Sequence, residues 1–261
     1  MKKNTIDTWF KKWFNTQEYL DLYKHRDNTD AARIIRLLFK NINLKKNAKV
    51  LDLACGNGRH SVLFANKGCN VTGIDLSKYL ISRANEKRKT DYFKYRQMLK
   101  FEIGDMRHIA HTNEFDLIVN IFSSFGYFES EKDNENVIKS IARALKQNGY
   151  FLFDFLNKDY LEKNLVPYDI KKEKEKIIIQ IRNIADGFVE KSIILIKKSP
   201  NSEKCPILNR YKEKIRLYSL ENFRKMFASS GLKILDVFGN YGGKKYIKNK
   251  SERLIILAKK I

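Results

Sequence analysis

The chain has 261 residues, of which 43% are hydrophobic, and carries a formal charge of +22. This length and composition fit one large domain, or a domain with an insert, because domains average about 100 to 200 residues. No apolar run approaches the roughly 18 residues that cross a bilayer, and "MKKNTIDTWFKKWF" lacks the apolar stretch of a signal peptide, so we expect a soluble cytoplasmic protein without membrane contact.

The basic charge has two explanations. Lys and Arg side chains that neutralise phosphates would suit RNA. Lys greatly outnumbers Arg, however, and Asn and Ile are also abundant, which is the composition that an AT-rich genome imposes on surface positions. RNA sites favour Arg, so both explanations stay open. The three cysteines, Cys55, Cys69 and Cys205, are odd in number and widely spaced, which excludes a disulfide framework and a CxxC metal site, and we expect no metal.

Residues 1–40 are predicted to be helical. Apolar and aromatic side chains recur at helix spacing at Ile6, Trp9, Phe10, Trp13 and Phe14. "NTDAARIIRLLFK" (28–40) opens with capping residues before an apolar stripe. Between these helices lies "YLDLYKHRD" (19–27), which is polar and aromatic together.

Residues 41–157 alternate between strands and helices. Short apolar runs such as "KVLDLA", "NVTGID" and "FDLIVNIF" are separated by helix-length segments such as "RHSVLFANKG". This alternation predicts a doubly wound α/β domain with a parallel sheet covered on both faces. Such a sheet binds its ligand beyond the carboxyl ends of its strands, here 52–58, Asp75, Asp105 and 120–128.

Residues 158–217 have the pattern of an antiparallel β insert. "KIIIQIRNI" and "VEKSIILIKK" flank an Asp-Gly turn, which predicts a hairpin, and "NRYKEKIRLYS" is a third candidate strand. Residues 218–261 then supply a helix, "SLENFRKMFASSG", and two closing strands, "LKILDVFG" and "SERLIILAKK".

The loop "LDLACGNGRH" (51–60) indicates a nucleotide site of a particular kind. It lacks the GxxxxGK[ST] signature of ATP and GTP sites, and Ser61 replaces the third glycine of the dinucleotide pattern GxGxxG. Asp52 at the strand end would repel a pyrophosphate but attract a cation. S-adenosylmethionine carries an ammonium and a sulfonium group against one carboxylate and suits this loop, where Gly56 and Gly58 let the backbone approach a ligand.

Two further acids end the next two strands. Asp75 follows the first glycine by about 20 residues, at a place where an acid can accept hydrogen bonds from ribose hydroxyls. Asp105 can accept one from the adenine amino group, with Met106 packed on the purine face. Three acids at successive strand tips favour a cofactor site over three unrelated caps or turns.

With these residues in place, the sequence resembles the class I S-adenosylmethionine-dependent methyltransferases. The matching segments are "VLDLACGNGRHS", "GIDLS", "GDMR", "FDLIVNIFSSFGYF" and "LKQNGYFLFDFLN". The resemblance covers the whole chain and implies a Rossmann-like seven-stranded sheet with an antiparallel last strand. It also implies that residues 1–40 fold over the cofactor as a helical lid. One departure is Ala54 in place of the first glycine of GxGxG, which costs backbone freedom.

The resemblance implies S-adenosylmethionine as cofactor. The residues expected to bind it are Asp52, Ala54, Gly56, Gly58, Asp75, Leu76, Asp105, Met106, Asn120, Ser123, Tyr23 and Arg26. Arg26 is expected to face the methionine carboxylate, with Tyr19 and Tyr23 beside it in the lid.

The turn "NIFSSFGYF" after the fourth strand is expected to border the transferring methyl group, and it differs from the "NPPY" pattern of amino-group DNA methyltransferases. Phe125, Tyr127 and Phe128 are candidates for the acceptor wall, with core packing as the alternative. Methyl transfer is an in-line displacement that positioning and a dry site can support. A general base is therefore optional, and the candidates are Tyr127, Tyr23 and His25. Weaker acceptor-side candidates are Tyr168, Arg210 and Tyr241.

We therefore predict methyl transfer from S-adenosylmethionine to an acceptor that the sequence does not identify. A small molecule is favoured over RNA (tRNA or rRNA), because no RNA-binding motif is present. Two alternatives belong to other classes: an NAD-dependent oxidoreductase, against which Asp52 and Ser61 count, and a non-catalytic protein that kept the cofactor site. The sequence carries no indication of the oligomeric state.

Overall fold

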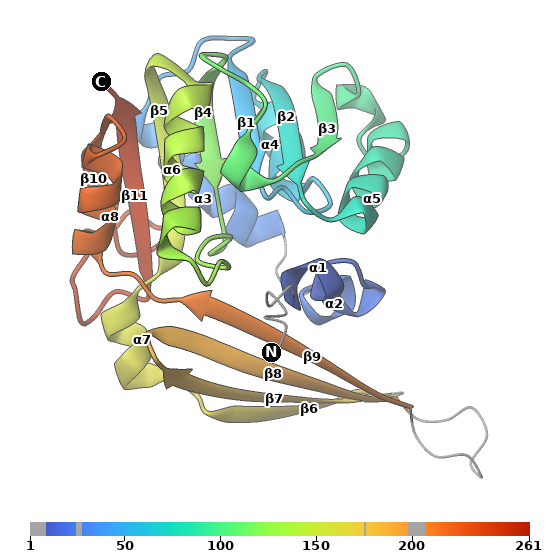
Figure 1. The fold of residues 1–261 in the computed structure, drawn as a ribbon. Helices are drawn as coiled ribbons and strands as arrows, with labels where there is room; N and C mark the ends of the chain where they lie inside the picture. The colour runs from blue at the N-terminus through green and yellow to red at the C-terminus, as the bar shows by residue number, and fades with distance from the viewer. Residues whose placement is uncertain (1–8, 25–27, 175, 198–206) are drawn as a thin grey trace, which may run out of the picture.

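A computed structural model describes residues 9–24, 28–174, 176–197 and 207–261. The core is a seven-stranded sheet in the order β10-β11-β5-β4-β1-β2-β3 (Figure 1). Its strands are β1 Lys49–Leu53, β2 Asn70–Asp75, β3 Leu99–Ile103, β4 Phe115–Asn120, β5 Leu145–Leu156, β10 Leu232–Phe238 and β11 Arg253–Lys260. Strands β3, β2, β1, β4 and β5 are mutually parallel, and β11 is antiparallel to β5 and β10. The predicted doubly wound sheet with an antiparallel last strand is confirmed.

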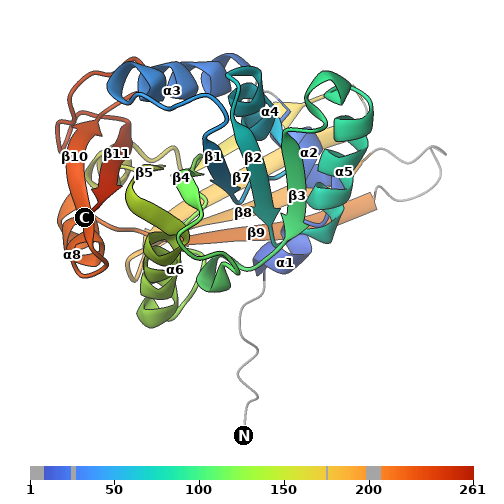
Figure 2. The ribbon, with the colours of Figure 1, turned by 90° about the horizontal axis from the view of Figure 1, so that it is seen from above.

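Helices cover both faces of this sheet (Figure 2). One face carries α3 Asn28–Asn41, α4 Arg59–Asn66 and α5 Lys78–Lys89, and the other carries α6 Glu131–Ala144 and α8 Leu220–Ala228. The short 3-10 helices η1 Phe93–Tyr95 and η2 Met106–His108 flank β3. Side chains of β5 alternate between the two faces, because Phe151 and Phe153 pack toward α8 whereas Leu152 packs with α3 and α4.

The N-terminal lid is shorter than predicted. Ile34, Ile35 and Leu38 of α3 are buried against Phe64 of α4, so α3 belongs to the sheet and not to the lid. Within the described residues the lid consists of α1 Trp9–Trp13 and α2 Gln17–Leu22, which lie between the sheet and the insert (Figure 1). The amphipathic pattern of residues 28–40 shows that the helix is packed but not on which element.

The insert is a second sheet, antiparallel and four-stranded, in the order β6-β7-β8-β9. After α7 Lys158–Asn164 come β6 Tyr168–Lys172, β7 Lys176–Ala185, β8 Phe188–Lys197 and β9 Ile207–Arg216. The predicted hairpin is β7 and β8, and both turn residues, Asp186 and Gly187, have positive φ (51° and 77°), as a type I′ turn requires. Strand β6 was not predicted, because this edge strand exposes most of its side chains. Within the described ranges, no helix is long and apolar enough to cross a membrane.

Candidate cofactor and acceptor site

The loop between β1 and α4 is left-handed at alternate residues. The φ angles of Ala54, Gly56 and Gly58 are 59°, 58° and 84°. Glycine adopts this region freely, whereas alanine bears about 1–2 kcal/mol of strain. A Cβ atom at Gly58 would lie 2.6 Å from Cζ of Phe101 in β3. Glycine at position 58 therefore permits both the turn and the close approach of α4 to the sheet.

Asp52 is buried at the end of β1 and lines the larger of two cavities. Ser61 Oγ, in the first turn of α4, donates a 2.6 Å hydrogen bond to Asp52 Oδ2. Burial raises the pKa of Asp52 to about 7, although the hydrogen bond from Ser61 opposes the shift. A carboxylate in this environment is stabilised by a neighbouring cation.

Asp75 connects the glycine loop to the tip of β2. Its Oδ2 accepts a hydrogen bond from the Gly56 amide (2.9 Å) and its Oδ1 accepts one from the Ser77 amide (2.8 Å). It lines the smaller cavity together with Leu76. Since each carboxylate oxygen has two lone pairs, Asp75 can still accept hydrogen bonds from ribose hydroxyls.

Asp105 and Met106 line the same smaller cavity after β3. Arg107 donates to both oxygens of Asp105, from Nη2 at 2.6 Å and from Nε at 3.1 Å, and also reaches Asp133 at 3.1 Å. Burial acts to raise the pKa of Asp105, but the hydrogen bonds from Arg107 outweigh it and the pKa is lowered. Arg107 thus keeps the Asp105 carboxylate ionised and fixes its orientation, a role that the sequence analysis missed.

The two cavities meet at the tips of β1 and β4. Their volumes are about 890 Å³ and about 60 Å³. The wall residues that they share are Phe14, Tyr19, Ala54, Gly56, Ser124 and Tyr127. The smaller cavity is lined by the predicted ribose and adenine residues, and the larger one is lined by the lid, the strand tips, α7 and the insert. A group that lies at the shared wall can therefore contact molecules bound in either cavity.

Aromatic rings of the lid cover this shared wall. The ring centroid of Tyr127 lies 5.3 Å from that of Trp9 and 5.6 Å from that of Phe14. Burial raises the pKa of Tyr127, so its phenol stays protonated and is a poor general base. Phe128 lines the smaller cavity, between the ring of Phe10 and the Arg107 guanidinium.

A buried carboxylate that the sequence analysis missed fastens the lid to the insert. Glu213 of β9 accepts hydrogen bonds from Trp13 Nε1 (2.7 Å) and Tyr23 OH (2.6 Å) and pairs with Lys191 Nζ of β8 (2.6 Å). Burial acts to raise the pKa of Glu213, but the Lys191 charge and these hydrogen bonds outweigh it and the pKa is lowered. Tyr23 therefore lines the larger cavity at the junction of lid and insert.

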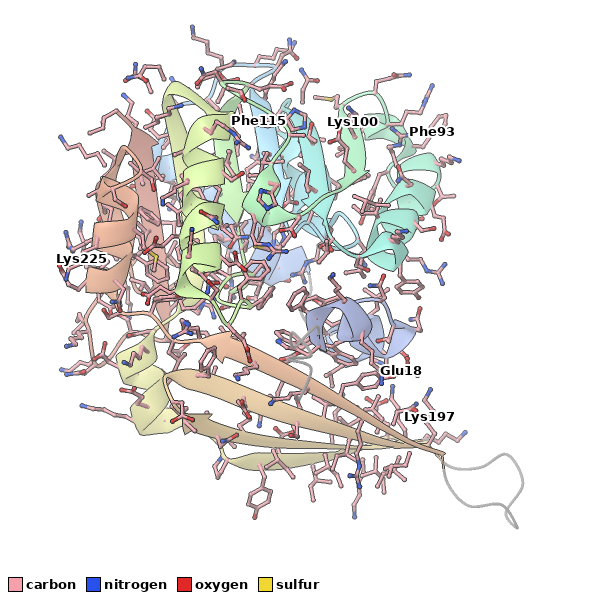
Figure 3. The ribbon with its side chains drawn as sticks, viewed as in Figure 1. Glu18, Phe93, Lys100, Phe115, Lys197 and Lys225 are labelled. Carbon is pink, nitrogen blue, oxygen red and sulfur yellow. The ribbon has the colours of Figure 1, made fainter. Side chains whose placement is uncertain are left out.

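A second ion pair joins the same two parts. Lys197 Nζ of β8 lies 2.7 Å from Glu18 Oε1 of α2, and the two side chains face each other at the outer end of the insert (Figure 3). Tyr19, one helical position further on, packs on Phe14 at 4.9 Å and lines both cavities.

The turn after β4 has a strained backbone and is stabilised by hydrogen bonds to the buried side chain of Asp154. Phe122 and Ser123 both have φ of 61°, a conformation that costs about 1–3 kcal/mol for each residue that is not glycine. The buried Asp154 accepts hydrogen bonds from the Phe122 amide (2.9 Å) and Tyr241 OH (2.9 Å), and from Arg253 Nη2 (2.7 Å). Arg253 Nη2 also donates to Ser123 Oγ at 2.9 Å. Ser123 and Arg253 line the larger cavity, whereas Tyr241 supports the turn without lining either cavity.

Two other predicted residues are packed in the protein core. Phe125 is 1% exposed, with its ring 5.3 Å from that of Phe153, so it belongs to the core and not to the acceptor wall. Asn120 is fully buried and donates to the Leu53 carbonyl at 3.1 Å, which ties the tips of β4 and β1 together.

Two acceptor candidates lie on the outside of the insert. Tyr168 is 65% exposed on β6, and Arg210 is exposed on β9; neither lines the two cavities. The prediction that these two residues lie on the acceptor side of the site is therefore wrong. The predicted lid residues His25 and Arg26 lie outside the described residues.

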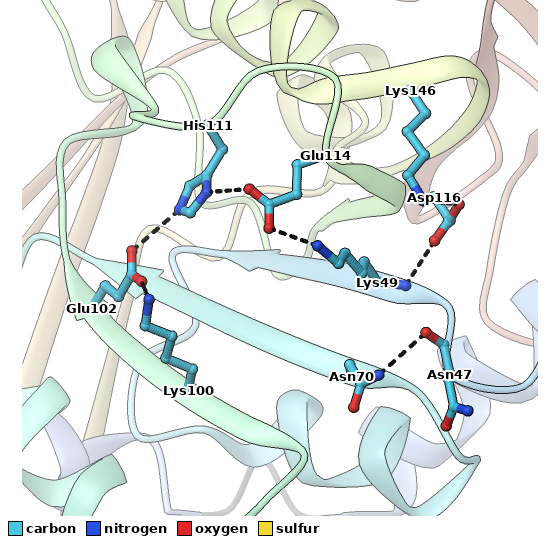
Figure 4. Close-up of polar contacts among 9 residues, drawn as sticks. All are labelled: Asn47, Lys49, Asn70, Lys100, Glu102, His111, Glu114, Asp116 and Lys146. Atoms are coloured by element: carbon cyan, nitrogen blue, oxygen red, sulfur yellow. Dashed lines mark hydrogen bonds and ion pairs between the residues drawn. The ribbon is translucent and has the colours of Figure 1, made fainter.

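Another cluster of titratable side chains lies around the amino-terminal ends of β1 and β4 (Figure 4). His111 lies between Glu114 (2.7 Å) and Glu102 (3.3 Å), and Lys49 pairs with Glu114 at 3.1 Å. These groups contact one another at the edge of the sheet opposite to the two cavities, so we assign them a structural role. In the part of the chain that the structure describes, no group of three or more His, Cys, Asp or Glu side chains could hold a metal ion.

Comparisons with known proteins identify the family. Residues 44–220 match a family described as a methyltransferase domain. The chain is 38% identical over 113 residues to YqeM of Bacillus subtilis, a match that spans 43% of this chain and 44% of that protein. It is 25% identical over 213 residues to the cypemycin N-terminal methyltransferase of a Streptomyces species, which spans 80% of this chain and 82% of that protein.

Solved structures agree in fold. An S-adenosylmethionine-dependent methyltransferase from Clostridium acetobutylicum matches with a TM-score of 0.77 at 23% identity, over 93% of this chain and 98% of that chain. The amino pentose methyltransferase CalS10 from Micromonospora echinaspora, solved with S-adenosylmethionine bound, matches with a TM-score of 0.68 at 16% identity, over 94% and 98%. The family match, the sheet order and the acids at the strand tips together establish that the chain belongs to the class I S-adenosylmethionine-dependent methyltransferases.

Proposed function

We propose that this protein transfers a methyl group from S-adenosylmethionine to a small molecule held in the larger cavity. The observation that carries the proposal is the pair of cavities that share a wall at the tips of β1 and β4. The adenosine part of the cofactor would bind in the smaller cavity, and the methyl group would reach the shared wall near Ser124 and Tyr127.

The chemical types of the side chains at the strand tips match the groups of this cofactor. Asp52 would face the ammonium group, Asp75 the ribose hydroxyls, and Asp105 and Met106 the adenine. The smaller cavity can hold the adenosine part of the cofactor only after the lid moves. A cavity needs about 10–15 Å³ for one water molecule, so about 60 Å³ holds a few waters and no nucleoside. We expect α1, which contributes Phe10 to this wall, to shift outward when the cofactor binds.

The size of the larger cavity supports a small acceptor. Its volume of about 890 Å³ falls within the roughly 300–1,000 Å³ typical of small-molecule sites. When bound, the cofactor supplies an electrophilic methyl group. This chemistry would exchange the carbon–sulfur bond of the cofactor for a bond between the methyl carbon and the acceptor atom, with the electron pair of the broken bond left on sulfur. The protein contributes by positioning the acceptor and by excluding water with the rings of Trp9, Phe14 and Tyr127.

An RNA acceptor is the second candidate, and one surface feature favours it. Phe93 on η1 is 54% exposed, and the Arg96 guanidinium lies 3.8 Å from its ring centroid (Figure 3 shows Phe93 at the outer edge). Exposed aromatic rings beside cations can stack on RNA bases. Tyr92, which precedes Phe93 in the sequence, lines the larger cavity.

The test is transfer of radiolabelled methyl from S-adenosylmethionine into a source-cell extract, counted separately in the RNA and small-molecule fractions. The Asp52→Ala protein serves as blank. We expect label in the small-molecule fraction. Label in RNA alone would contradict the small acceptor, and label in neither fraction would contradict methyl transfer itself.

A further inference from the structure

The wall of the larger cavity carries more positive than negative charge. Among the described residues that form it, six are Lys or Arg and three are Asp or Glu. Glu213 pairs with Lys191. Two acids behind the wall pair with wall arginines, Asp154 with Arg253 and Asp169 with Arg182. S-adenosylmethionine does not supply the missing negative charge, because it brings two cationic groups and one carboxylate. Even with these partners counted, six cationic side chains stand against five carboxylates, and this positive balance favours an anionic second substrate.

Two of these cations, Arg59 and Arg253, contact the strained turn after β4. The Arg59 guanidinium lies 4.9 Å from the ring centroid of Phe122, and the His60 ring lies 5.2 Å from the same centroid. On the other side of the turn, Arg253 Nη2 donates to Ser123 Oγ. The start of α4 and the start of β11 thus bring cationic and neutral donors to one stretch of wall, next to the wall shared with the cofactor cavity.

His60 provides an independent observation. Its side chain lines the cavity and is 7% exposed, and its buried Nε2 atom has no hydrogen-bond partner among the residues that the structure describes. Buried polar atoms without partners are rare in native proteins, and a ligand is one explanation for them. Burial and the neighbouring Arg59 charge lower the pKa of His60 to about 3, so the imidazole is neutral and can present an N–H donor at this nitrogen.

We propose that Arg59, His60, Ser123 and Arg253 form an anion subsite, and that the acceptor is a small molecule whose carboxylate or phosphate group binds there. With its charged end at the subsite, the acceptor would extend its nucleophilic atom toward Ser124 and Tyr127. This inference rests on the proposed methyl transfer and adds the chemical class of the acceptor.

The first experiment divides the small-molecule extract on an anion exchanger at pH 7 before incubation with radiolabelled S-adenosylmethionine. We expect label in compounds that the exchanger retains. Phosphatase treatment of the retained fraction removes the acceptor if it is a phosphate and leaves it if it is a carboxylate. Label confined to unretained compounds overturns the anion subsite but leaves methyl transfer intact. Absence of label in every fraction overturns the proposed function as well.

The second experiment tests whether the Arg59 charge binds the acceptor at the anion subsite. For Arg59→Gln we expect KM for the retained acceptor fraction to rise at least about tenfold, as for a lost charge-assisted hydrogen bond. The affinity for S-adenosylhomocysteine, measured by calorimetry, should stay within about twofold of wild type, and Arg59→Lys should restore part of the activity. Arg33→Gln, on the exposed side of α3, is the matched control. Equal loss of S-adenosylhomocysteine affinity in Arg59→Gln would assign Arg59 to the cofactor carboxylate and overturn the subsite.

Discussion

The carboxylate of Glu213 holds the lid against the insert, and removal of its charge should measure this contact. In Glu213→Gln the side chain keeps an oxygen that can accept from Trp13 and Tyr23, but Lys191 loses its counter-charge. Breaking a buried ion pair from one side costs about 3–5 kcal/mol. The Lys191 and Glu213 side chains are 14% and 13% exposed, and the retained acceptor softens the loss. We therefore expect the free energy of unfolding to fall by about 2–3 kcal/mol.

The matched control lies in the same pair of strands. Glu190 is opposite Lys214 on the other face of the β8–β9 ladder, and its side chain is 28% exposed. Glu190→Gln should change stability by less than about 1 kcal/mol. Urea unfolding followed by circular dichroism gives both values. Equal losses in the two variants, or a loss below about 1 kcal/mol for Glu213→Gln, would refute the buried-pair argument.

The pH dependence of the same contact has a definite sign. The pKa of Glu213 is lowered in the folded protein from its ordinary value of 4.5. Its contribution is therefore fully present above pH 4.5 and is lost as the pH falls through the folded pKa. The difference in stability between wild type and Glu213→Gln should shrink below pH 4.5; a constant difference down to acid unfolding would contradict the lowered pKa.

Further predictions concern the strand tips and the outer face. Because the pKa of Asp52 is raised to about 7 and a bound ammonium favours its ionised form, calorimetric affinity for S-adenosylhomocysteine should fall as the pH drops below 7, and Asp52→Asn should remove this slope. Asp75→Asn should weaken the same affinity by about 1–3 kcal/mol, through the lost charge at the ribose site; unchanged affinity would remove Asp75 from that site. Gly58→Ala should destabilise the fold by about 1–3 kcal/mol in thermal unfolding, since the new methyl group meets Phe101 at a positive φ. Arg210→Gln should leave S-adenosylhomocysteine affinity and methyl transfer unchanged, because Arg210 faces away from both cavities.

The parts of the site that could be predicted from the sequence are those set by local pattern. Alternating strands and helices place the residues after each parallel strand at one edge, so Asp52, Asp75 and Asp105 are brought together by topology alone. The structure places all three in the cavity walls. The Asp-Gly turn of the insert could also be predicted from local sequence, because Asp-Gly is a residue pair that favours the two positive φ angles of this turn.

The parts that could not be predicted depend on contacts between distant residues. Glu213 meets Trp13 across 200 residues, and Arg253 meets Asp154 across 99. A single acid or arginine in an otherwise apolar strand, as in "FLFDFLN" and "SERLIIL", was the available signal, but it does not name the partner. The sequence places Phe125 at the acceptor wall, but a left-handed turn just before it directs its ring into the core. This turn could not be predicted, because its residues are of types that usually avoid positive φ.

The most direct test of the account is a fluorescence titration with S-adenosylhomocysteine. The chain has two tryptophans, Trp9 and Trp13, and both lie in α1, so intrinsic fluorescence reports on the lid. If the cofactor enters the smaller cavity by displacing α1, the titration should give a saturable change that matches the calorimetric affinity, is weakened in Asp75→Asn and is absent with NAD. Calorimetric binding of S-adenosylhomocysteine without any change in tryptophan fluorescence, or an equal response to NAD, would contradict a cofactor site between the lid and the strand tips.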